Sequence, residues 1–349
     1  MDVRLLTGTK DLERYDAWVK AHPMGSLWQS IEWKTFQEAL GRETRIFALM
    51  EGAQILASAL VVIDRTSFGL STWDIPRGPL LAEQMNNGQW TMDNAVSTLL
   101  EQITTDARKD HCLSIYLSPS KQLSIFHSPF RITPSGRHEQ PQATRILDLT
   151  RTEEEILRQM KPKGRYNITV AEKNGVRVEE SQDVDAFYAL MKETGGRDRF
   201  GILPKAHYET FLKALHGSFL FLATAPSPTP LPRIGGGDGG GGVIAGLLGV
   251  IWGSNGIYYY GASSYDHRAF MAPYALQWAA MRHCKTKGCV SYDLLGIAPP
   301  DAGEDHPWHG VGTFKEKFGG EVVTYLPEQQ IILRPMAFHL LALKRRLWK

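Results

Sequence analysis

Residues 256–297 read GIYYYGASSYDHRAFMAPYALQWAAMRHCKTKGCVSYDLLGI, and this stretch carries the pattern that decides the fold. Its aromatic run at 257–260 is typical of a β-strand, which is expected to stop at Gly261. Pro273 suits the first turn of a helix, and Gly288 suits the residue that ends one. A second strand is expected directly after that glycine. The stretch therefore predicts a strand–helix–strand unit, with a right-handed crossover if the strands are parallel.

Length and composition predict an α/β protein of two domains with mixed sheets. With 349 residues, 43% of them hydrophobic, the chain can bury a sizeable core and is longer than most single domains. The expected first domain comprises residues 1–143 and is completed by 326–349. The second comprises 144–325 and carries a Gly- and Pro-rich insertion at 226–242. No Gly-Lys-Ser/Thr follows these glycines, so a nucleotide-phosphate loop is not expected there.

Overall charge and cysteine content restrict the class of protein. The net charge of +2 is too small to indicate a nucleic-acid partner, so any polyanion would have to meet a local basic patch. Three cysteines form neither an even disulfide set nor a metal-ligand quartet, which favours buried thiols in a reducing compartment and no metal site. Neither a signal peptide nor a run of about 20 apolar residues is found. We therefore expect a cytoplasmic protein.

A proline-rich turn in the first domain holds an arginine. Pro76-Arg77-Gly78-Pro79 fixes the backbone tightly. Two duties are open for Arg77. It is either a surface guanidinium that caps nearby carbonyl groups or a contact to an anionic substrate, which its planar fork suits.

A basic segment follows the domain boundary. The capping-box sequence at 152–155 predicts a helix start, and beyond it come Lys161, Lys163 and Arg165, with Tyr166 beside them. Such a run is often only a solvated face. The alternative is contact with a phosphate backbone, because lysine and arginine next to an aromatic ring are what a nucleic-acid strand requires.

Motifs of conventional catalysis are missing from the sequence. It contains no Gly-x-Ser-x-Gly and no His-Glu-x-x-His. It also lacks the Arg/Gln-x-x-Gly-x-Gly/Ala loop that holds acetyl-coenzyme A in acetyltransferases. The motifs that are present supply positively charged and aromatic side chains, and no recognised catalytic group.

Five motifs in the same order resemble the FemABX peptidyltransferases. They are Gln29-Ser30 with Trp33, the Pro-Arg-Gly-Pro turn at 76–79, Lys163-x-Arg165-Tyr166-Asn167-Ile168 with Gly175-Val176, the Tyr259-Tyr260-Gly261-Ala262-Ser263 strand, and Gly312-Thr313-Phe314-Lys315-x-x-Phe318-Gly319-Gly320. The last is the most specific, and the resemblance runs nearly end to end.

The resemblance implies two tandem acetyltransferase-like (GNAT) domains that work without coenzyme A. It implies an enzyme that moves an amino acid from aminoacyl-tRNA to the side-chain amine of a peptidoglycan precursor, with no further cofactor. The sequence has no room for a helical arm, so it is similar to the armless FemX type, and a monomer is expected. Two alternatives stay open: a coenzyme A-dependent acyltransferase acting on a cell-envelope precursor, and a non-catalytic binder of such precursors.

The family pattern also suggests roles for individual residues. It implies that Lys315 stabilises the developing oxyanion, which a fixed ammonium in a water-poor site can do. Phe314 beside it and Tyr260 are implied to contact substrate, although Tyr260 is also a reasonable core residue. The family arginine four residues before Tyr208 is replaced by proline here. Lys205 next to that position can supply a point charge but not a bidentate fork.

Two further expectations concern the ends of the chain. Near the N-terminus Lys34 is implied as a substrate contact, although it directly follows the tryptophan where the family lysine comes a few residues later. At the C-terminus the segment 340–349, LLALKRRLWK, combines leucines at helical spacing with basic residues. Such a helix either packs on the first domain or makes peripheral contact with the inner face of an anionic membrane.

Overall fold

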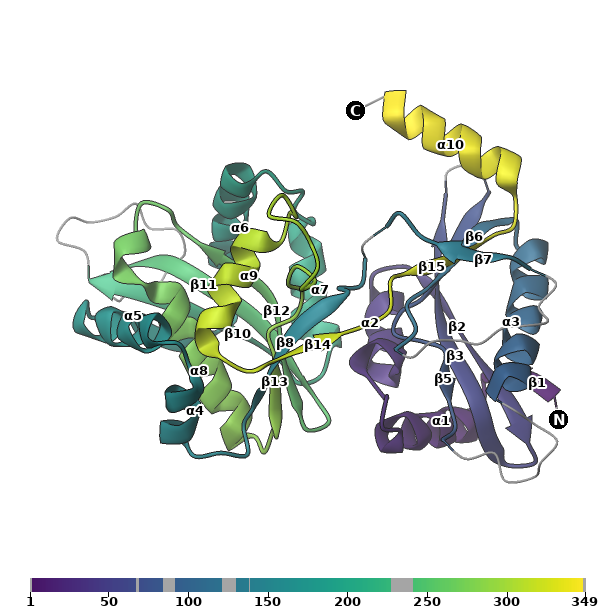
Figure 1. Ribbon diagram of the computed structural model, residues 1–349, viewed down its shortest axis with the longest axis horizontal. Coiled ribbons are helices and arrows are strands. Elements are labelled where there is room, and N and C mark those ends of the chain that lie inside the picture. Colours follow the sequence, from purple (N-terminus) through teal and green to yellow (C-terminus); the bar gives the residue numbers. More distant parts are fainter. Residues whose placement is uncertain are drawn as a thin grey trace. The chain divides into compact units, whose positions relative to one another are not determined.

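The chain folds into two compact units. The computed structural model describes residues 2–66, 69–83, 92–120, 130–137, 139–226 and 241–347. One unit comprises Met1–Gln142 with Tyr325–Lys349, and the other comprises Ala143–Thr324 (Figure 1). The limits expected from the sequence lie one residue beyond these boundaries. Each unit has a mixed sheet of its own.

The sheet of the first unit is built from strands that are distant in sequence. In spatial order its strands are β1 (Asp2–Leu5), β2 (Glu43–Glu51), β3 (Gln54–Arg65), β4 (Ser71–Ile75), β6 (Cys112–Leu117), β15 (Gln329–Ile332) and β7 (Ile132–Pro134), while β5 (Leu80–Leu81) pairs with β3. Its helical segments are α1 (Thr9–Ala21), η1 (Leu27–Gln29), α2 (Ile31–Ala39), α3 (Met92–Lys109) and α10 (Pro335–Leu347). The sequence predicts strands at 44–50 and 55–63 joined by a hairpin loop at 51–54, and a further strand at 112–117, and all of these are confirmed.

Alternation along the strands separates two faces of this sheet. On β2 and β3, residues such as Phe47, Ala59 and Val61 belong to one buried cluster together with Leu99 and Ile103 of α3. Strands β4 and β6 run parallel, and α3 connects them. The first unit therefore contains a strand–helix–strand element of the type expected in the second.

The second unit has the same plan with its own strand order. Its sheet runs β14 (Glu321–Thr324), β8 (Ala143–Asp148), β13 (Ser291–Asp293), β12 (Asn255–Ser263), β11 (Gly241–Trp252), β10 (Ser218–Pro226) and β9 (Arg177–Ser181). The helical segments are α4 (Glu153–Gln159), α5 (Pro162–Lys173), α6 (Val184–Asp198), α7 (Lys205–Ala214), η2 (Arg268–Phe270), α8 (Ala272–Thr286), α9 (His309–Lys315) and η3 (Glu316–Phe318). Thr152 caps α4 in a reciprocal capping box, as the sequence predicts.

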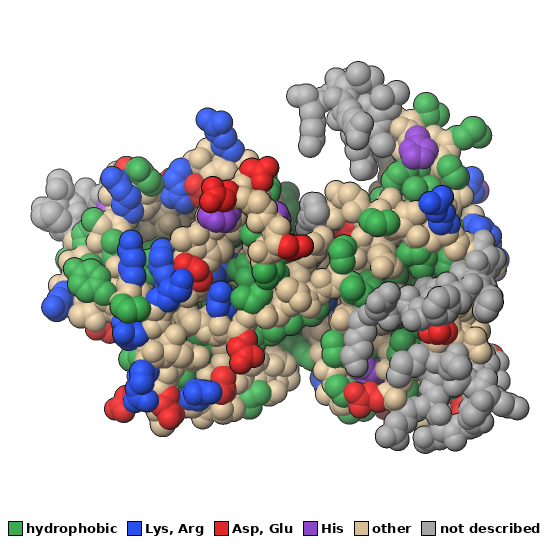
Figure 2. Space-filling model, viewed as in Figure 1, with side chains coloured by type: hydrophobic (Ala, Val, Ile, Leu, Met, Phe, Trp, Pro, Cys, Tyr) green, Lys and Arg blue, Asp and Glu red, His purple; other side chains and the backbone are tan. Residues whose placement is uncertain are grey.

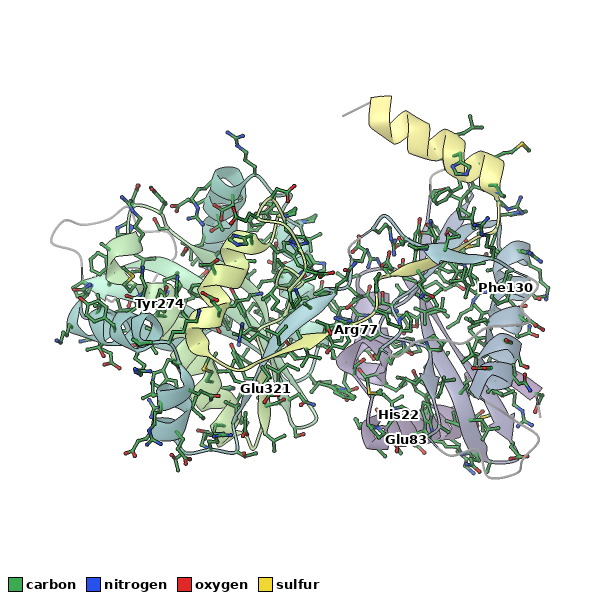
Figure 3. All side chains as sticks on the ribbon, viewed as in Figure 1. His22, Arg77, Glu83, Phe130, Tyr274 and Glu321 are labelled. Atoms are coloured by element: carbon green, nitrogen blue, oxygen red, sulfur yellow. The ribbon has the colours of Figure 1, made fainter. Side chains whose placement is uncertain are left out.

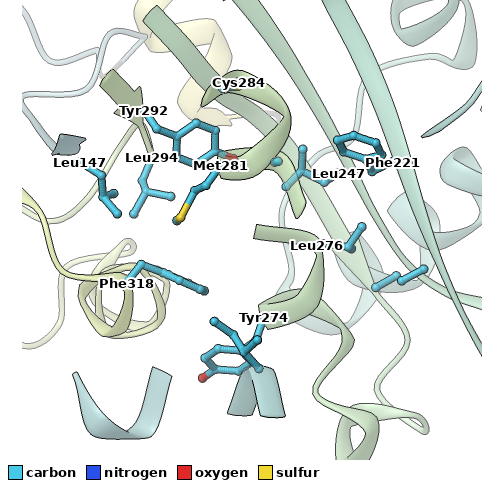
Figure 4. Close-up of a cluster of buried hydrophobic side chains, with 14 of the residues drawn as sticks. Leu147, Phe221, Leu247, Tyr274, Leu276, Met281, Cys284, Tyr292, Leu294 and Phe318 are labelled. Atoms are coloured by element: carbon cyan, nitrogen blue, oxygen red, sulfur yellow. The ribbon is translucent and has the colours of Figure 1, made fainter. Parts of the chain in front are cut away.

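One buried cluster holds the second unit together. Met281 and Cys284 of α8 pack among Leu147, Tyr292 and Phe318, which come from strands β8 and β13 and from η3 (Figure 4). Fully burying side chains of this size stabilises the fold by about 1.5 to 3 kcal/mol each, before entropy is subtracted. This packing ties the segment around η3 to the middle of the sheet.

The stretch that decides the fold behaves largely as predicted. Strands β12 and β13 are parallel, α8 joins them with Pro273 in its first turn, and Gly288 adopts φ +84° after its end. The expected stop at Gly261 is wrong. Gly261 pairs with Leu247, and the antiparallel ladder to β11 carries β12 on to Ser263.

Three other sequence expectations can be placed on the fold. All three cysteines are free and buried. Most of the insertion at 226–242 lies outside the described residues, which stop at Pro226 and resume at Gly241. In the described part of the chain, every helix is too short or too polar to cross a bilayer.

Candidate active site

A β-bulge on β12 turns its tyrosines to different sides. The register against β11 shifts between Leu248 and Gly249, so that Tyr259 is the extra residue between Tyr258 and Tyr260. Tyr259 and Tyr260 both contact Phe211 of α7, with ring centroids 5.1 and 5.8 Å away. Tyr258 instead lies 5.5 Å from the Lys315 ammonium, measured to its ring centroid. The bulge therefore separates an aromatic cluster on one side from a lysine on the other.

Lys315 is held at the end of α9 by backbone carbonyl groups. Its Nζ donates hydrogen bonds to the carbonyl oxygens of Leu295 (3.1 Å) and Gly296 (2.7 Å), and the residue is 6% exposed. A protonated lysine has three N–H donors, so one donor remains after these two bonds. The ammonium is thereby fixed in position and almost removed from water.

Asp293 shapes the loop that presents those carbonyl groups. Its carboxylate accepts a hydrogen bond from the Leu295 backbone N–H at 2.7 Å, and another from the Thr144 hydroxyl. Leu295 adopts φ +53°, a left-handed conformation that costs a residue with a branched side chain about 1 kcal/mol or more. The Asp293 contact offsets this strain and keeps the turn that receives Lys315.

Burial dominates the electrostatics of this lysine. It lowers the pKa of Lys315 to about 7, and the nearby Asp293 carboxylate opposes the shift. The adjacent phenol cannot supply compensating charge near neutrality, because burial raises the pKa of Tyr258 to about 12. A buried cation that is offset mainly by carbonyl dipoles can bind a developing negative charge strongly.

Aromatic packing anchors α9. Phe314 lies edge-on to Tyr274, which Figure 3 labels, and to Phe318, at centroid distances of 5.2 and 5.1 Å. Phe318 is fully buried, whereas Phe314 is only partly buried. This packing fixes the backbone that carries Lys315, and a substrate contact by Phe314 stays a prediction.

Tyr208 and Tyr260 come together on the other side of the sheet. Their rings meet edge-to-face at 5.2 Å, and the Tyr260 hydroxyl lies 3.0 Å from Nε2 of His207. Lys205, one turn earlier on α7, is partly exposed and forms ion pairs with Asp185 and Glu209. Tyr208 is 1% exposed and belongs to the packing of α7, so a direct substrate contact by this residue would need the cluster to open.

The basic residues of α5 lie next to the Lys315 segment. Lys161 pairs with Glu316 (2.9 Å), and its backbone N–H donates to the carbonyl oxygen of Lys317 (3.0 Å). Arg165 donates to the carbonyl oxygen of Met160, which terminates the preceding helix. Lys163 is exposed. The three predicted tRNA-binding residues are therefore on one helix start, but two of them hold internal partners.

Arg77 is buried in the first unit, so it is not a surface guanidinium, although it does cap a nearby carbonyl group as that alternative expected. It is 3% exposed, its guanidinium stacks 3.6 Å from the Tyr325 ring centroid, and it donates to the carbonyl oxygen of Pro141 at 2.8 Å (Figure 3). Gln29 holds the Pro-Arg-Gly-Pro turn in place, because its side-chain amide donates a hydrogen bond to the Pro76 carbonyl oxygen. Lys34 lies on α2 and pairs with Glu38 at 2.5 Å.

An ionic cluster in the first unit was not predicted from the sequence. Arg137 forms ion pairs with Asp74 and Glu328, and its guanidinium lies 3.4 Å from the Tyr116 ring centroid. Glu328 also accepts a hydrogen bond from the Ser135 hydroxyl. Burial raises the pKa of Asp74 to about 6, although the Arg137 charge opposes this. No sequence motif connects these residues, which lie in separate segments.

Sequence reasoning also missed the partners of Lys315, namely Asp293, Tyr258 and the carbonyl groups of the following loop. Asp293 lies inside the strand expected at 289–295, and only in the structure is it the last residue of that strand. The structure describes no group of three or more His, Cys, Asp and Glu side chains in the ranges given above that could hold a metal ion.

Comparison with known proteins assigns the family. The FemAB family model matches residues 11–140, 127–229 and 237–346. A lipid II:glycine glycyltransferase of Staphylococcus saprophyticus is 25% identical, over 91% of this chain and 89% of its own. A crystal structure of FemX superposes with a TM-score of 0.75 at 20% identity, covering 97% of this chain and 99% of that one.

A second solved structure relates the architecture to acetyltransferases. It is a tandem GNAT protein from the clavulanic acid biosynthesis pathway, with a TM-score of 0.56 at 10% identity over 94% of this chain and 97% of that one. The fold is thus the tandem acetyltransferase-like fold that the motifs indicate. The family match over most of its length shows that the chain belongs to the FemAB family.

Proposed function

We propose that this protein transfers an amino acid from aminoacyl-tRNA to the side-chain amine in the stem peptide of a peptidoglycan precursor, and so builds an interpeptide bridge. The observation that carries the proposal is the buried Lys315, whose ammonium is held by two carbonyl groups with one donor left over. Relatives that match this chain over nearly their whole length are named lipid II:glycine glycyltransferases.

The proposed reaction is a direct acyl transfer. The stem-peptide amine attacks the ester carbonyl of aminoacyl-tRNA, the C–N bond forms, and the carbonyl oxygen takes up negative charge. Lys315 stabilises that oxyanion with its third N–H. The intermediate then collapses and releases the ribose hydroxyl of the tRNA. The amine loses one proton and the departing ribose oxygen gains one, which the substrates can exchange between themselves.

The remaining site residues are assigned by the same proposal. Aminoacyl-tRNA is the co-substrate, and no further cofactor takes part. The tRNA is bound by Lys161, Lys163 and Arg165. Contacts to the precursor or the amino acid are assigned to Lys34 and Arg77 in the first unit and, separately, to Lys205, Tyr208, Tyr260 and Phe314 in the second. The buried members, Arg77 in the first unit and Tyr208 in the second, would each act chiefly by fixing the side chains packed around them.

Incubation of the protein with charged tRNA and a peptidoglycan precursor tests the proposal. Mass spectrometry of the precursor should show the mass of one added aminoacyl group. Parallel reactions with a soluble nucleotide-linked precursor and with a lipid-linked one identify which of the two is the substrate. A parallel reaction with acetyl-coenzyme A should release no thiol. Thiol release without aminoacyl transfer would assign coenzyme A chemistry, and precursor binding without any transfer would assign a binding protein.

A finer part of the proposal concerns α10 and the membrane. Met336 and Leu340, one turn apart on α10, are 84% and 68% exposed, so Leu340 does not pack on the first unit as the simpler expectation required. The sequence adds Lys344, Arg345 and Arg346 beyond them. An apolar side followed by basic residues suits peripheral contact with anionic lipid, with each basic residue contributing about 1 kcal/mol.

Sedimentation with vesicles that contain phosphatidylglycerol tests this membrane contact. We expect weak binding at low salt that is lost at high salt and on removal of residues 344–349. A protein that stays in the supernatant under both conditions would limit α10 to a role within the protein.

A further inference from the structure

Helix α5 presents exposed basic and aromatic side chains along one side, with Val170 between them. At 100° per residue, Lys163, Tyr166, Val170 and Lys173 fall within about a quarter of the helix circumference. Lys163 and Lys173 are exposed, and Tyr166 is 68% exposed. In Figure 2, Lys and Arg side chains gather on the part of the second unit where α5 lies. This set, here called the α5 stripe, is distinct from the residues that hold the helix in place.

The opposite side of α5 explains why the stripe faces outward. Gly164, Asn167, Ile168 and Ala171 are the buried residues of the helix. At Gly164 a Cβ atom would lie 2.2 Å from the carbonyl oxygen of Lys317, so the helix start is pressed directly against η3. The buried side is therefore fixed by close backbone contact, and the helix cannot rotate to hide the stripe.

Charge along the stripe has one sign. The helix has a single acidic residue, Glu172, which lies 100° from Lys173 and so outside the stripe. Lys161 and Arg165, by contrast, are engaged with Glu316 and with the Met160 carbonyl. The lysines of the stripe are therefore better placed to meet an external anion than the two neighbouring basic residues.

We propose that the α5 stripe binds the unpaired 3′-terminal nucleotides of aminoacyl-tRNA, with Tyr166 stacking on a base and Lys163 and Lys173 contacting phosphates. This inference rests on the proposed function and names the part of the tRNA that the second unit grips. Single-stranded nucleic acid is recognised by this combination of aromatic platforms and flanking cations, without need for sequence-specific hydrogen bonds.

The dimensions of the stripe fit a short unpaired tail. From Lys163 to Lys173 the helix rises about 15 Å, which corresponds to about four stacked nucleotides at about 3.4 Å each. The Lys163 end is the one that packs on η3, and η3 begins directly after Lys315. A tail lying along the stripe thus leads its terminal, acylated nucleotide toward the lysine that stabilises the oxyanion.

Binding of a labelled RNA hairpin, measured by fluorescence anisotropy at several salt concentrations, tests the stripe. One hairpin carries an unpaired four-nucleotide 3′ tail, and a second has a blunt end. We expect the tailed hairpin to bind more tightly. Tyr166→Ala should weaken this binding about tenfold, whereas Tyr166→Phe should retain it. Lys163→Gln and Lys173→Gln should each reduce the slope of log K against log salt by about 0.7.

A matched control and a transfer assay separate the outcomes. Lys213→Gln removes an exposed lysine from α7 and should change neither the affinity nor the slope. In the transfer assay, Tyr166→Ala should raise the KM for aminoacyl-tRNA by much more than it lowers kcat. If the wild-type protein transfers the aminoacyl group but the stripe variants change neither the KM for aminoacyl-tRNA nor the affinity for the hairpin, the inference is wrong and the proposed function stands.

Two other results have equally definite meanings. If tailed-hairpin binding depends on Tyr166 while no aminoacyl transfer occurs, the stripe is an RNA-binding surface and the proposed function is wrong. If instead the stripe variants abolish binding to phosphatidylglycerol vesicles and leave hairpin binding unchanged, the stripe is a membrane surface, and our assignment to RNA is overturned.

Discussion

The two units share a strand–helix–strand element and differ in the charge that each buries near it. In the first unit, β4 and β6 flank α3, and Arg137 is neutralised there by Asp74 and Glu328. In the second unit, β12 and β13 flank α8, and Lys315 is held there by two carbonyl oxygens. No ion pair with Lys315 is found among the described residues.

This difference separates a structural use of buried charge from a chemical one. A cation that is paired with two carboxylates attracts a transition-state anion only weakly, because its charge is already neutralised. Removing it leaves the two carboxylates buried without a counter-charge. A cation that is held by dipoles keeps its attraction for new negative charge, at the cost of a lowered pKa. The same fold therefore supports both uses of buried charge.

The largest effect is expected where the charges compensate one another. Replacing Arg137 by Met should destabilise the first unit by about 3 to 5 kcal/mol, because Asp74 and Glu328 would face each other without a cation. Urea denaturation followed by circular dichroism measures this loss. The triple variant Arg137→Met, Asp74→Asn, Glu328→Gln should recover much of it, and a triple variant as unstable as the single one would contradict the compensated-cluster explanation.

Replacing Lys315 by Met should reduce activity and leave stability nearly unchanged, in contrast to the Arg137 variant. We expect kcat for aminoacyl transfer to fall about 100- to 1000-fold, as when one oxyanion donor is lost, with little loss of fold stability. Lys317→Met, two residues later, is the matched control and should stay within about threefold of the wild-type protein. Near-normal turnover of the Lys315 variant would remove this lysine from the mechanism.

Local patterns in the sequence predicted local structure well. The capping box at Thr152, the glycine after α8 and the strand Cys112–Leu117 all depend on residues that are near neighbours in sequence. The ion pair between Arg137 and Glu328 joins residues 191 positions apart, and no propensity or spacing rule can anticipate such a contact. Long-range pairing of this kind is fixed only when β15 enters the sheet beside β6 and β7.

The candidate site shows the same limit. The motif ending in Phe318-Gly319-Gly320 indicated Lys315, and the resemblance implied a water-poor site, but the motif itself does not show that the side chain is buried. Its depth follows from the packing of Phe318 in the core and from the left-handed turn at Leu295. Likewise, the run of three tyrosines indicated a strand, but the bulge at Tyr259 depends on the partner strand β11.

The lowered pKa of Lys315 makes a prediction about stability that needs no substrate. Between about pH 7 and pH 10 the unfolded chain holds a proton on this lysine that the folded protein has released, so stability should rise with pH over this interval. Relative to Lys315→Met, the wild-type protein should gain about 1.4 kcal/mol per pH unit. Urea midpoints at pH 7, 8 and 9 measure this gain. A difference that is constant with pH would mean that Lys315 remains charged in the fold.

The smallest effect concerns Asp293, a positioning residue. Its carboxylate raises the pKa of Lys315 against the larger effect of burial, so Asp293→Asn should lower that pKa further while its amide oxygen can still accept the Leu295 N–H. Oxyanion stabilisation needs the ammonium form, so kcat should decline with rising pH, and in the variant this decline should begin at lower pH. Asp301→Asn, at an exposed position of the same unit, should leave the profile in place. If Asp293→Asn lowers kcat equally at every pH, the Asp293 carboxylate only supports the loop and does not influence the pKa of Lys315.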